Sequence, residues 1–324
     1  SNNTNASVYA VNAGNTNNSL VNVSINVTNI SVEGTASVFV RWYVDVNVTF
    51  SDQNNPSVYL PLPGATTTGI FNSSSILDAT GTTDSTGIKR LELAEIEVNS
   101  SGINYLTPHN VTMLFSSSSG NAENFSYVNL SLLNNTIVNF HVNLNCSAPV
   151  DTLSITQNTV LCPGTYTIDD SDSTKGVINF GANNINLTCD QTIINGTRGI
   201  KTSSFGIYND GNTGVGIHNC TIGEYGTGIY FIDANNFIID GVSTTSKIDV
   251  LSTTGGKINN FSVSYSTTVY GTPPGLNLVG SSSNSISNGT FNTGWEGIVL
   301  KSSGSDSSDN NNIQNITFSD QIFG

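Results

Sequence analysis

Charged residues are scarce in this chain, and basic residues are scarcer still. Only 10% of the 324 residues are charged, and 9 Lys and Arg face 23 Asp and Glu, which gives a formal net charge of −14. An average globular protein has about 25% charged residues. Nucleic acids and anionic membranes are bound by basic surfaces. The composition therefore argues against both partner classes, and no apolar run approaches the ~20 residues of a membrane span.

Strong helix formers are few as well. Asn, Ser and Thr, together with 31 Gly, take the place of Lys and Glu. Such a composition disfavours helices and suits strands that are joined by tight turns. We therefore predict an all-β chain in three parts: an extended N-terminal arm (1–20), an Ig-like antiparallel β-sandwich (21–147) and a parallel β-solenoid (148–324).

The N-terminal part is predicted from alternation. From Val21, apolar residues alternate with polar ones as far as Val27, which is the pattern of a half-buried strand. The arm before it is polar and lacks a clear period. Further β signals, with turn residues between them, suit a sandwich of about seven strands. They cover 36–50, 57–62, 88–98, 103–115 and 123–145; the segment 88–98 has a short helix as its alternative.

Internal repetition begins near residue 148. A glycine followed by apolar residues recurs at Gly206, Gly228, Gly275 and Gly297, and a second apolar segment follows several of them. If each period is one coil, equivalent residues stack about 4.8 Å apart, and Asn side chains can hydrogen-bond along the column. The third residue of each second segment defines this predicted ladder: Asn195, Asn219, Asp240, Asn260, Asn288 and Asn315.

Several segments carry a family resemblance: DTLSITQNTVLCPGTYTID (151–169), GANNINLTCDQTIING (181–196), GIYNDGNTGVGIHNCTI (206–222) and GTGIYFIDANNFIIDG (226–241). They resemble pectate-lyase-like β-helix repeat proteins, in the form common among archaeal cell-surface proteins. The resemblance covers slightly over half the chain. It implies a right-handed parallel β-helix whose first coils carry the cysteines. It brings no fixed activity, because function lies in sites and not in folds.

Cysteines and glycosylation sequons indicate an extracellular protein. The candidates for disulfides are Cys146, Cys162, Cys189 and Cys220, and no C-x-x-C pair suggests zinc. Three connectivities are open, and we favour Cys162 with Cys189 because they flank one predicted coil. Asn-x-Ser/Thr sequons are abundant. We expect N-linked glycans at Asn2, Asn5, Asn17, Asn22, Asn72 and Asn99, and not at the ladder asparagines, whose stacking would block a glycan.

Catalytic residues are not evident. Enzymes with this fold cleave acidic polysaccharides, and they need carboxylates at set separations or a basic residue near the acidic proton. In the solenoid, basic residues do not recur at equivalent coil positions. His109, His141 and His218 are the only histidines, and no G-x-S-x-G elbow occurs. A metal site at His218 and Cys220 is conceivable, but packing is the simpler role. We predict no enzyme; a polysaccharide lyase or glycoside hydrolase is the alternative.

Calcium is the one cofactor that the sequence suggests. Asp169, Asp170 and Asp172 crowd three carboxylates into one loop, and calcium takes oxygen ligands from such loops. The alternative is a solvated acidic turn.

Two functions remain open. The first is a structural surface protein, a glycosylated subunit that joins its own copies into a filament, sheath or surface layer through the N-terminal arm and the open solenoid end. The second is a carbohydrate-binding adhesin or enzyme on the lateral face, where Tyr208 and Tyr230 occupy equivalent coil positions.

Overall fold

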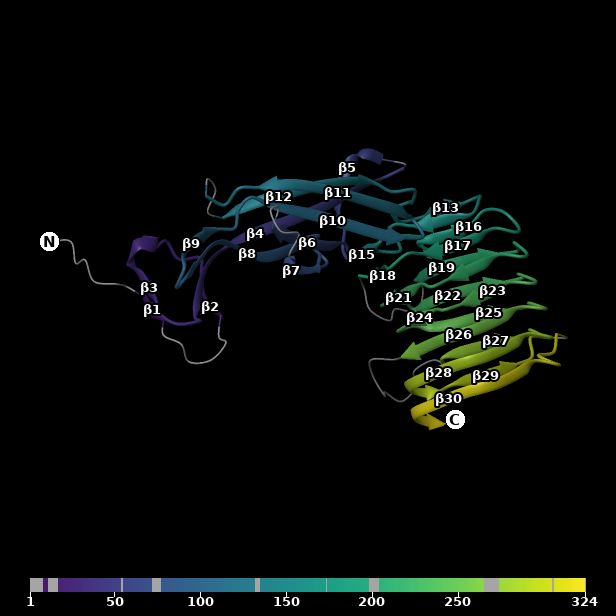
Figure 1. Ribbon diagram of the computed structural model, residues 1–324. Coiled ribbons are helices and arrows are strands. Elements are labelled where there is room, and N and C mark those ends of the chain that lie inside the picture. The colour runs from purple at the N-terminus through teal and green to yellow at the C-terminus, as the bar shows by residue number, and fades with distance from the viewer. Residues whose placement is uncertain are drawn as a thin grey trace. The chain divides into compact units, whose positions relative to one another are not determined.

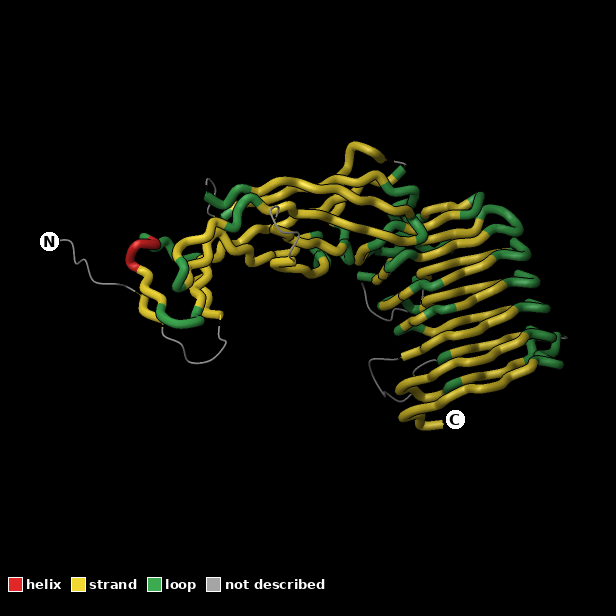
Figure 2. Tube along the Cα trace, in the orientation of Figure 1, coloured by secondary structure: helices red, strands yellow, loops and turns green. Residues whose placement is uncertain are grey.

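The computed structural model describes residues 8–10, 17–53, 55–71, 77–131, 135–172, 174–197, 204–264, 274–304 and 306–323. In these ranges the chain is all-β, with one 3-10 turn, η1 (Val27–Asn29), and no α-helix (Figure 2). Contacts divide it into two compact units, 1–51 with 55–144 (unit 1) and 52–54 with 145–324 (unit 2).

The described residues of unit 1 form two main sheets and one small one. Its strands are β1 (Val8–Ala10), β2 (Asn17–Val21), β3 (Ile30–Val32), β4 (Ser37–Asp52), β5 (Asn55–Pro61), β6 (Thr66–Phe71), β7 (Leu77–Thr82), β8 (Ile88–Asn99), β9 (Gly102–Tyr105), β10 (His109–Ser117), β11 (Gly120–Val128) and β12 (Thr136–Asn143). One main sheet has the order β11-β10-β6-β7. The other is β12-β4-β8-β9, in which β2 and β5 also pair with β4, and β1 pairs with β3.

The long strand β4 organises unit 1. Its apolar residues alternate, so that Val44, Val46 and Val48 are fully buried while their neighbours are half-buried. The two sheets touch where Gly69 of β6 leaves room for Leu93 of β8. The predicted strand at 88–98 is confirmed by β8.

The antiparallel sandwich needs one correction. Strand β4 pairs antiparallel with β8, but it pairs in parallel with β2 and with β12, so this sheet is mixed. The strand predicted from Val21 is also wrong. Strand β2 ends at Val21, and Val23 is 43% exposed. Asn26 then caps the η1 turn by accepting the N–H of Thr28. Without a partner strand, the local alternation does not produce a strand.

The predicted arm is partly paired. Within 1–20 the structure describes β1 and most of β2, and both pair with strands of the same chain, β3 and β4. The rest of the arm, including Asn2 and Asn5, lies outside the described residues.

Unit 2 is made of parallel strands (Figure 1). In its described part, one sheet runs β13 (Leu153–Ile155), β16 (Ile178–Phe180), β19 (Phe205–Asp210), β22 (Thr227–Ile232), β25 (Lys247–Leu251), β27 (Leu276–Val279) and β29 (Ile298–Lys301). The other contains β14 (Thr159–Leu161), β15 (Gly164–Thr167), β17 (Asn186–Cys189), β18 (Thr192–Asn195), β20 (Gly216–His218), β21 (Thr221–Gly223), β23 (Ile238–Asp240), β24 (Ser243–Thr244), β26 (Lys257–Ser264), β28 (Ser285–Glu296) and β30 (Asn312–Phe323).

The chain alternates between these two sheets, so like residues lie over like. Ile207 pairs with Ile229, and Ile229 with Ile248, and all three are fully buried. Rings fill the wider parts of the core, where Phe231 packs edge-on against Phe180 and Phe237. A continuous apolar interior of stacked side chains therefore holds unit 2 together.

The disulfides differ from the favoured pairing. Cys146 is bonded to Cys162 and Cys189 to Cys220, each with Cα atoms 4.9 Å apart. The register explains why Cys162 and Cys189 do not pair, because the residue that lies opposite Cys189 is Leu161. All four candidates are thus used, but in different pairs.

The predicted ladder is present in part. Asn219, Asn260, Asn288 and Asn315 all have left-handed backbone, with φ between 50° and 58°. Asn219 directly follows β20, whereas the other three turn the chain within β26, β28 and β30. Asn315 Nδ2 donates to Asn288 Oδ1 at 3.2 Å. Asn260, Asn288 and Asn315 are exposed and Asn219 is exposed as well, so these asparagines stack at the surface and not inside.

Two predicted members differ from the other four in backbone position. Asp240 pairs with His218 and with Asn259, and Gly241 (φ 69°) takes the left-handed corner that follows. The side chain of Asp240 still belongs to the column, because Asn260 Nδ2 donates to Asp240 Oδ1 at 3.0 Å. Glycine adopts left-handed backbone without the cost of a Cβ, so the register of IIDGVS shifts by one. Asn195 ends β18, which pairs with β21, so Asn195 lies opposite Gly223 and not opposite Asn219.

Candidate functional site

A column of polar and aromatic side chains runs along the sheet that contains β16, β19 and β22. Asn179 pairs with Tyr208, Tyr208 with Tyr230, and Tyr230 with Asp249. The rings of Tyr208 and Tyr230 stack with centroids 5.4 Å apart and planes 3° apart. Both tyrosines are half-buried, in contrast to the fully buried isoleucines beside them.

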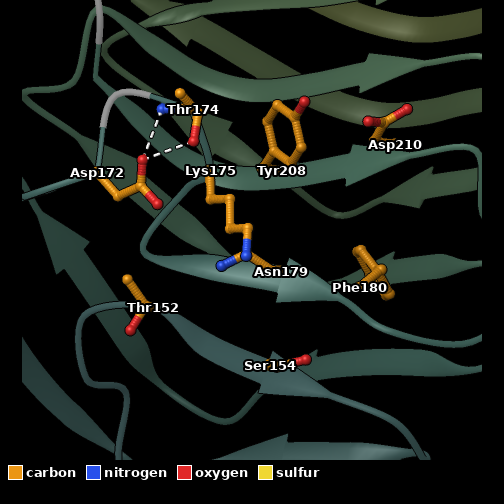
Figure 3. Close-up of a pocket in the computed structure, with 9 residues that line it drawn as sticks. All are labelled: Thr152, Ser154, Asp172, Thr174, Lys175, Asn179, Phe180, Tyr208 and Asp210. Carbon is orange, nitrogen blue, oxygen red and sulfur yellow. Dashed lines mark hydrogen bonds between the residues drawn. The ribbon is translucent and has the colours of Figure 1, made fainter.

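A cavity of about 560 Å³ opens at the first strands of this sheet (Figure 3). It is lined by Thr152, Ser154, Asp172, Thr174, Lys175, Asn179, Phe180, Tyr208 and Asp210. The backbone explains why space is left there. Asn179 folds back, since its Nδ2 donates to the Gly176 carbonyl at 2.7 Å and its Oδ1 accepts the Gly176 N–H. A Cβ on Gly176 would lie 2.9 Å from Tyr208 Cβ, so only glycine fits.

The cavity combines an aromatic ring with charges of both signs. Asp172 Oδ1 accepts the N–H and the hydroxyl of Thr174 at 3.0 and 2.6 Å, and these hydrogen bonds lower the pKa of Asp172. Lys175 supplies an ammonium group, and Asp210 a second carboxylate. Burial raises the pKa of Tyr208, with a smaller effect of Asp210. This set can stack on a flat ligand and hydrogen-bond its hydroxyl groups.

Further along the column, Asp249 forms an ion pair and hydrogen bonds with neighbouring side chains. Its Oδ2 lies 2.5 Å from Lys247 Nζ and accepts the Thr227 hydroxyl at 3.4 Å, and Asn277 Nδ2 donates to its Oδ1 at 3.3 Å. A carboxylate held in this way positions the column and is a poor general base.

The three carboxylates predicted to bind calcium have separate environments. Asp172 belongs to the cavity, whereas Asp170 is 7% exposed and its Oδ2 accepts the Phe205 N–H at 2.7 Å. Burial raises the pKa of Asp170 from 3.8 to about 6, with the charges of Asp151 and Asp172 adding to it and N–H groups opposing it. Among the described residues, no group of three or more His, Cys, Asp or Glu could hold a metal ion. Calcium at Asp169, Asp170 and Asp172 stays a prediction.

None of the histidines lies in a catalytic arrangement. The ring of His141 contacts the hydroxyls of Thr49 (3.2 Å) and Ser51 (3.3 Å), but the Ser51 hydroxyl donates to the amide of Asn143. His218 contacts Asn186, and a thiolate ligand beside it is ruled out because Cys220 is disulfide-bonded.

His109 belongs to a network of polar contacts around the buried Asp78 that sequence reasoning missed. Its Nε2 lies 3.2 Å from Asp78 Oδ2, and Arg41 Nη1 lies 2.8 Å from Asp78 Oδ1. The three residues are far apart in the sequence, so no local motif signals the network.

The glycosylation candidates are only partly described. Asn22 is exposed, although its Oδ1 accepts a hydrogen bond from Asn135 at 2.8 Å. Asn99 is half-buried, and its Oδ1 accepts the N–H of Ser101. Asn17 begins β2, and nothing is described of its side chain. Asn2, Asn5 and Asn72 lie outside the described residues.

No family model matches the chain, and no curated protein matches it. Among solved structures, a suspected glycosyl hydrolase from Parabacteroides merdae is similar at 12% identity and a TM-score of 0.37, covering 52% of this chain and 83% of that one. The shaft pilin SpaA from Lactobacillus rhamnosus GG is similar at 14% identity and a TM-score of 0.23. That match covers 36% of this chain and 54% of the pilin. TM-scores this low do not define a shared fold. In the described part of the chain, no helix is long and apolar enough to cross a membrane.

Proposed function

We propose that this protein is an extracellular, non-catalytic structural protein whose copies join through the N-terminal strand β2 into a surface assembly. In this proposal unit 2 is a right-handed parallel β-helix that serves as a stiff spacer. Two disulfides and many sequons support an oxidising, extracellular compartment.

The observation that carries the proposal is the way in which β2 is held. It pairs in parallel with Ser37–Arg41 at one edge of β4. Asn18 and Ser19 are exposed, and Leu20 and Val21 only half-buried, so the strand is attached mainly by backbone hydrogen bonds. The backbone hydrogen bonds between β2 and β4 are the same whether both strands come from one copy or from two. The same edge of a second copy can therefore accept β2 by strand exchange.

The test compares two variants of the full chain at Leu20. In a parallel pair every second N–H faces the partner strand, and because the Asn22 N–H donates to the Arg41 carbonyl, the Leu20 N–H also faces β4. Leu20→Pro removes this N–H, while Leu20→Ala keeps it. We expect assemblies of the wild type and of Leu20→Ala in negative-stain micrographs, and folded monomers for Leu20→Pro. Equal assembly by all three proteins would contradict the role of β2.

Carbohydrate binding at the Tyr208 cavity is a second candidate. It is favoured by the aromatic ring, the ammonium group and the two carboxylates around one opening. Tyr208→Ala should abolish retention on immobilised neutral polysaccharides, and Tyr127→Ala, at an exposed tyrosine of unit 1, should not. Release of unsaturated or reducing sugar ends during the assay would instead indicate an enzyme.

A further inference from the structure

Two carboxylate oxygens in unit 2 are buried without any hydrogen-bond partner: Asp151 Oδ1 and Asp170 Oδ1. The other oxygen of each group is engaged. Asp170 Oδ2 accepts the Phe205 N–H at 2.7 Å, and Asp151 Oδ2 accepts the hydroxyl of Ser171. One hydrogen bond thus fixes the orientation of each carboxylate, and the Oδ1 atom of each remains without a hydrogen-bond donor.

Two observations relate the carboxylates to each other. Ser171, the residue after Asp170, donates to Asp151, and the charge of Asp151 adds to the burial that raises the pKa of Asp170, so the two acidic groups interact electrostatically. Tyr225 is fully buried within electrostatic reach of both, and its hydroxyl donates to the Ile168 carbonyl at 3.0 Å. The surroundings of both carboxylates therefore include the phenol of Tyr225.

A buried carboxylate oxygen without a hydrogen-bond donor destabilises the fold, because it loses its hydrogen bonds to water and forms none within the protein. Two such oxygens with like charge add repulsion. A cation relieves both costs. Hard cations prefer an all-oxygen environment, and calcium accepts irregular sets of carboxylate, carbonyl and water oxygens.

We propose that Asp151 and Asp170 bind a divalent cation, best matched by calcium, through their unpartnered Oδ1 atoms. This donor set differs from the loop Asp169, Asp170 and Asp172, because Asp172 faces the Tyr208 cavity and Asp151 takes its place. The ion links the turn before β13 to the segment after β15, and through the Phe205 N–H to the start of β19. It thus fastens the first strands of unit 2, whatever unit 2 binds or assembles with.

The experiment uses terbium as a probe for the calcium site in the full, disulfide-bonded chain. Excitation of tyrosine should produce a saturable terbium emission, sensitised through Tyr225, that calcium displaces. Asp170→Asn and Asp151→Asn should each lose this component, whereas Asp172→Asn should keep it. Calcium should also raise the unfolding temperature of the wild type and of Asp172→Asn, but not of the other two variants.

Asp151→Asn keeps the test decisive if Asp170→Asn does not fold, because Asp151 is only partly buried. Emission that persists in Asp151→Asn would overturn the proposal. Emission that is lost in Asp172→Asn and kept in Asp151→Asn would also overturn it, in favour of the acidic loop.

Discussion

At the scale of single residues, Asp78 is a buried carboxylate of unit 1 with several hydrogen-bond partners. Asp78 accepts hydrogen bonds from His109 and from the Ala94 N–H and pairs with Arg41. Burial alone would raise the pKa of Asp78, but these hydrogen bonds and the Arg41 charge outweigh it and hold the pKa below its ordinary value of 3.8. A buried group of this kind stabilises the fold only in its charged form.

The pH dependence follows from the sign of that shift. Because the pKa of Asp78 is lower in the folded state, its contribution is complete above the unfolded pKa and is lost as the pH falls through the folded value. We expect the urea midpoint of the wild type to drop as the pH is lowered from 5 to 2. In Asp78→Asn, this part of the pH dependence should disappear.

At pH 7, Asp78→Asn should cost about 2–3 kcal/mol of unfolding free energy, because it removes the buried carboxylate that pairs with Arg41, whose side chain is 20% exposed and keeps its hydrogen bond to the Glu92 carbonyl. Asp45 is the matched control. It pairs with Arg90 at 2.7 Å, but the Arg90 side chain is 59% exposed. Asp45→Asn should therefore cost less than about 1 kcal/mol. Equal losses of unfolding free energy in Asp78→Asn and Asp45→Asn would show that burial does not determine how much these ion pairs stabilise the fold.

The corner asparagines give a second prediction at this scale. Asn260 has φ 50°, where a residue with a Cβ is strained, while Asn259 before it lies in the extended strand β26. Asn260→Gly should be more stable than Asn260→Ala by about 1 kcal/mol in urea unfolding. At Asn259 the order should reverse, since glycine weakens a strand. The same order at both positions would mean that side-chain hydrogen bonds, and not backbone shape, hold the corner.

At the scale of strands and the links between them, the sequence predicts what repeats and misses what depends on distant partners. Parallel pairing is predictable from recurring segments such as Gly206–Tyr208 and Gly228–Tyr230, which do pair. At Asp240 the predicted ladder keeps its side-chain hydrogen bond to Asn260, but the left-handed corner lies at Gly241. The segment IIDGVS offers two candidate corner residues, and only the three-dimensional register decides between them. The strand expected after Val21 is absent, since alternation does not guarantee a partner strand.

The candidate site shows the same limit. Tyr208 and Tyr230 are expected in one column, and the structure stacks them. Asn179 lines the cavity beside them, and its side chain is held by the Gly176 backbone, a contact that has no sequence signature. The sequence gives no sign that Asp151 lies near Asp170, because the strands β13, β14 and β15 separate the two residues along the chain.

The disulfide Cys189–Cys220 links the end of β17 to the residues that follow β20. It closes a loop with a sequence separation of 31. Restricting the unfolded chain in this way stabilises by about 3–4 kcal/mol. Replacing both cysteines by Ala should lower the stability of unit 2 by that amount, as followed by hydrogen exchange, while the exchange of unit 1 strands stays unchanged. Faster exchange throughout unit 1 would mean that the two units unfold as one.

At the scale of the whole molecule, net charge controls how copies meet. A formal charge of −14 makes every copy repel every other at long range. If copies join by strand exchange, as proposed, the contact itself consists of backbone hydrogen bonds, which salt hardly affects. The long-range repulsion, by contrast, is screened, because the Debye length falls from about 30 Å at 0.01 M salt to about 8 Å at 0.15 M.

Assembly should therefore accelerate with salt and approach a plateau near physiological ionic strength. We expect the rate of light-scattering growth to rise steeply between about 10 and 150 mM NaCl and to change little above that. Leu20→Pro, which lacks an N–H that faces β4, should stay monomeric at every salt concentration, so that the rise is tied to β2 and not to salting-out. Assembly that slows as salt is added would instead point to attraction between oppositely charged patches, since only such contacts are weakened by screening.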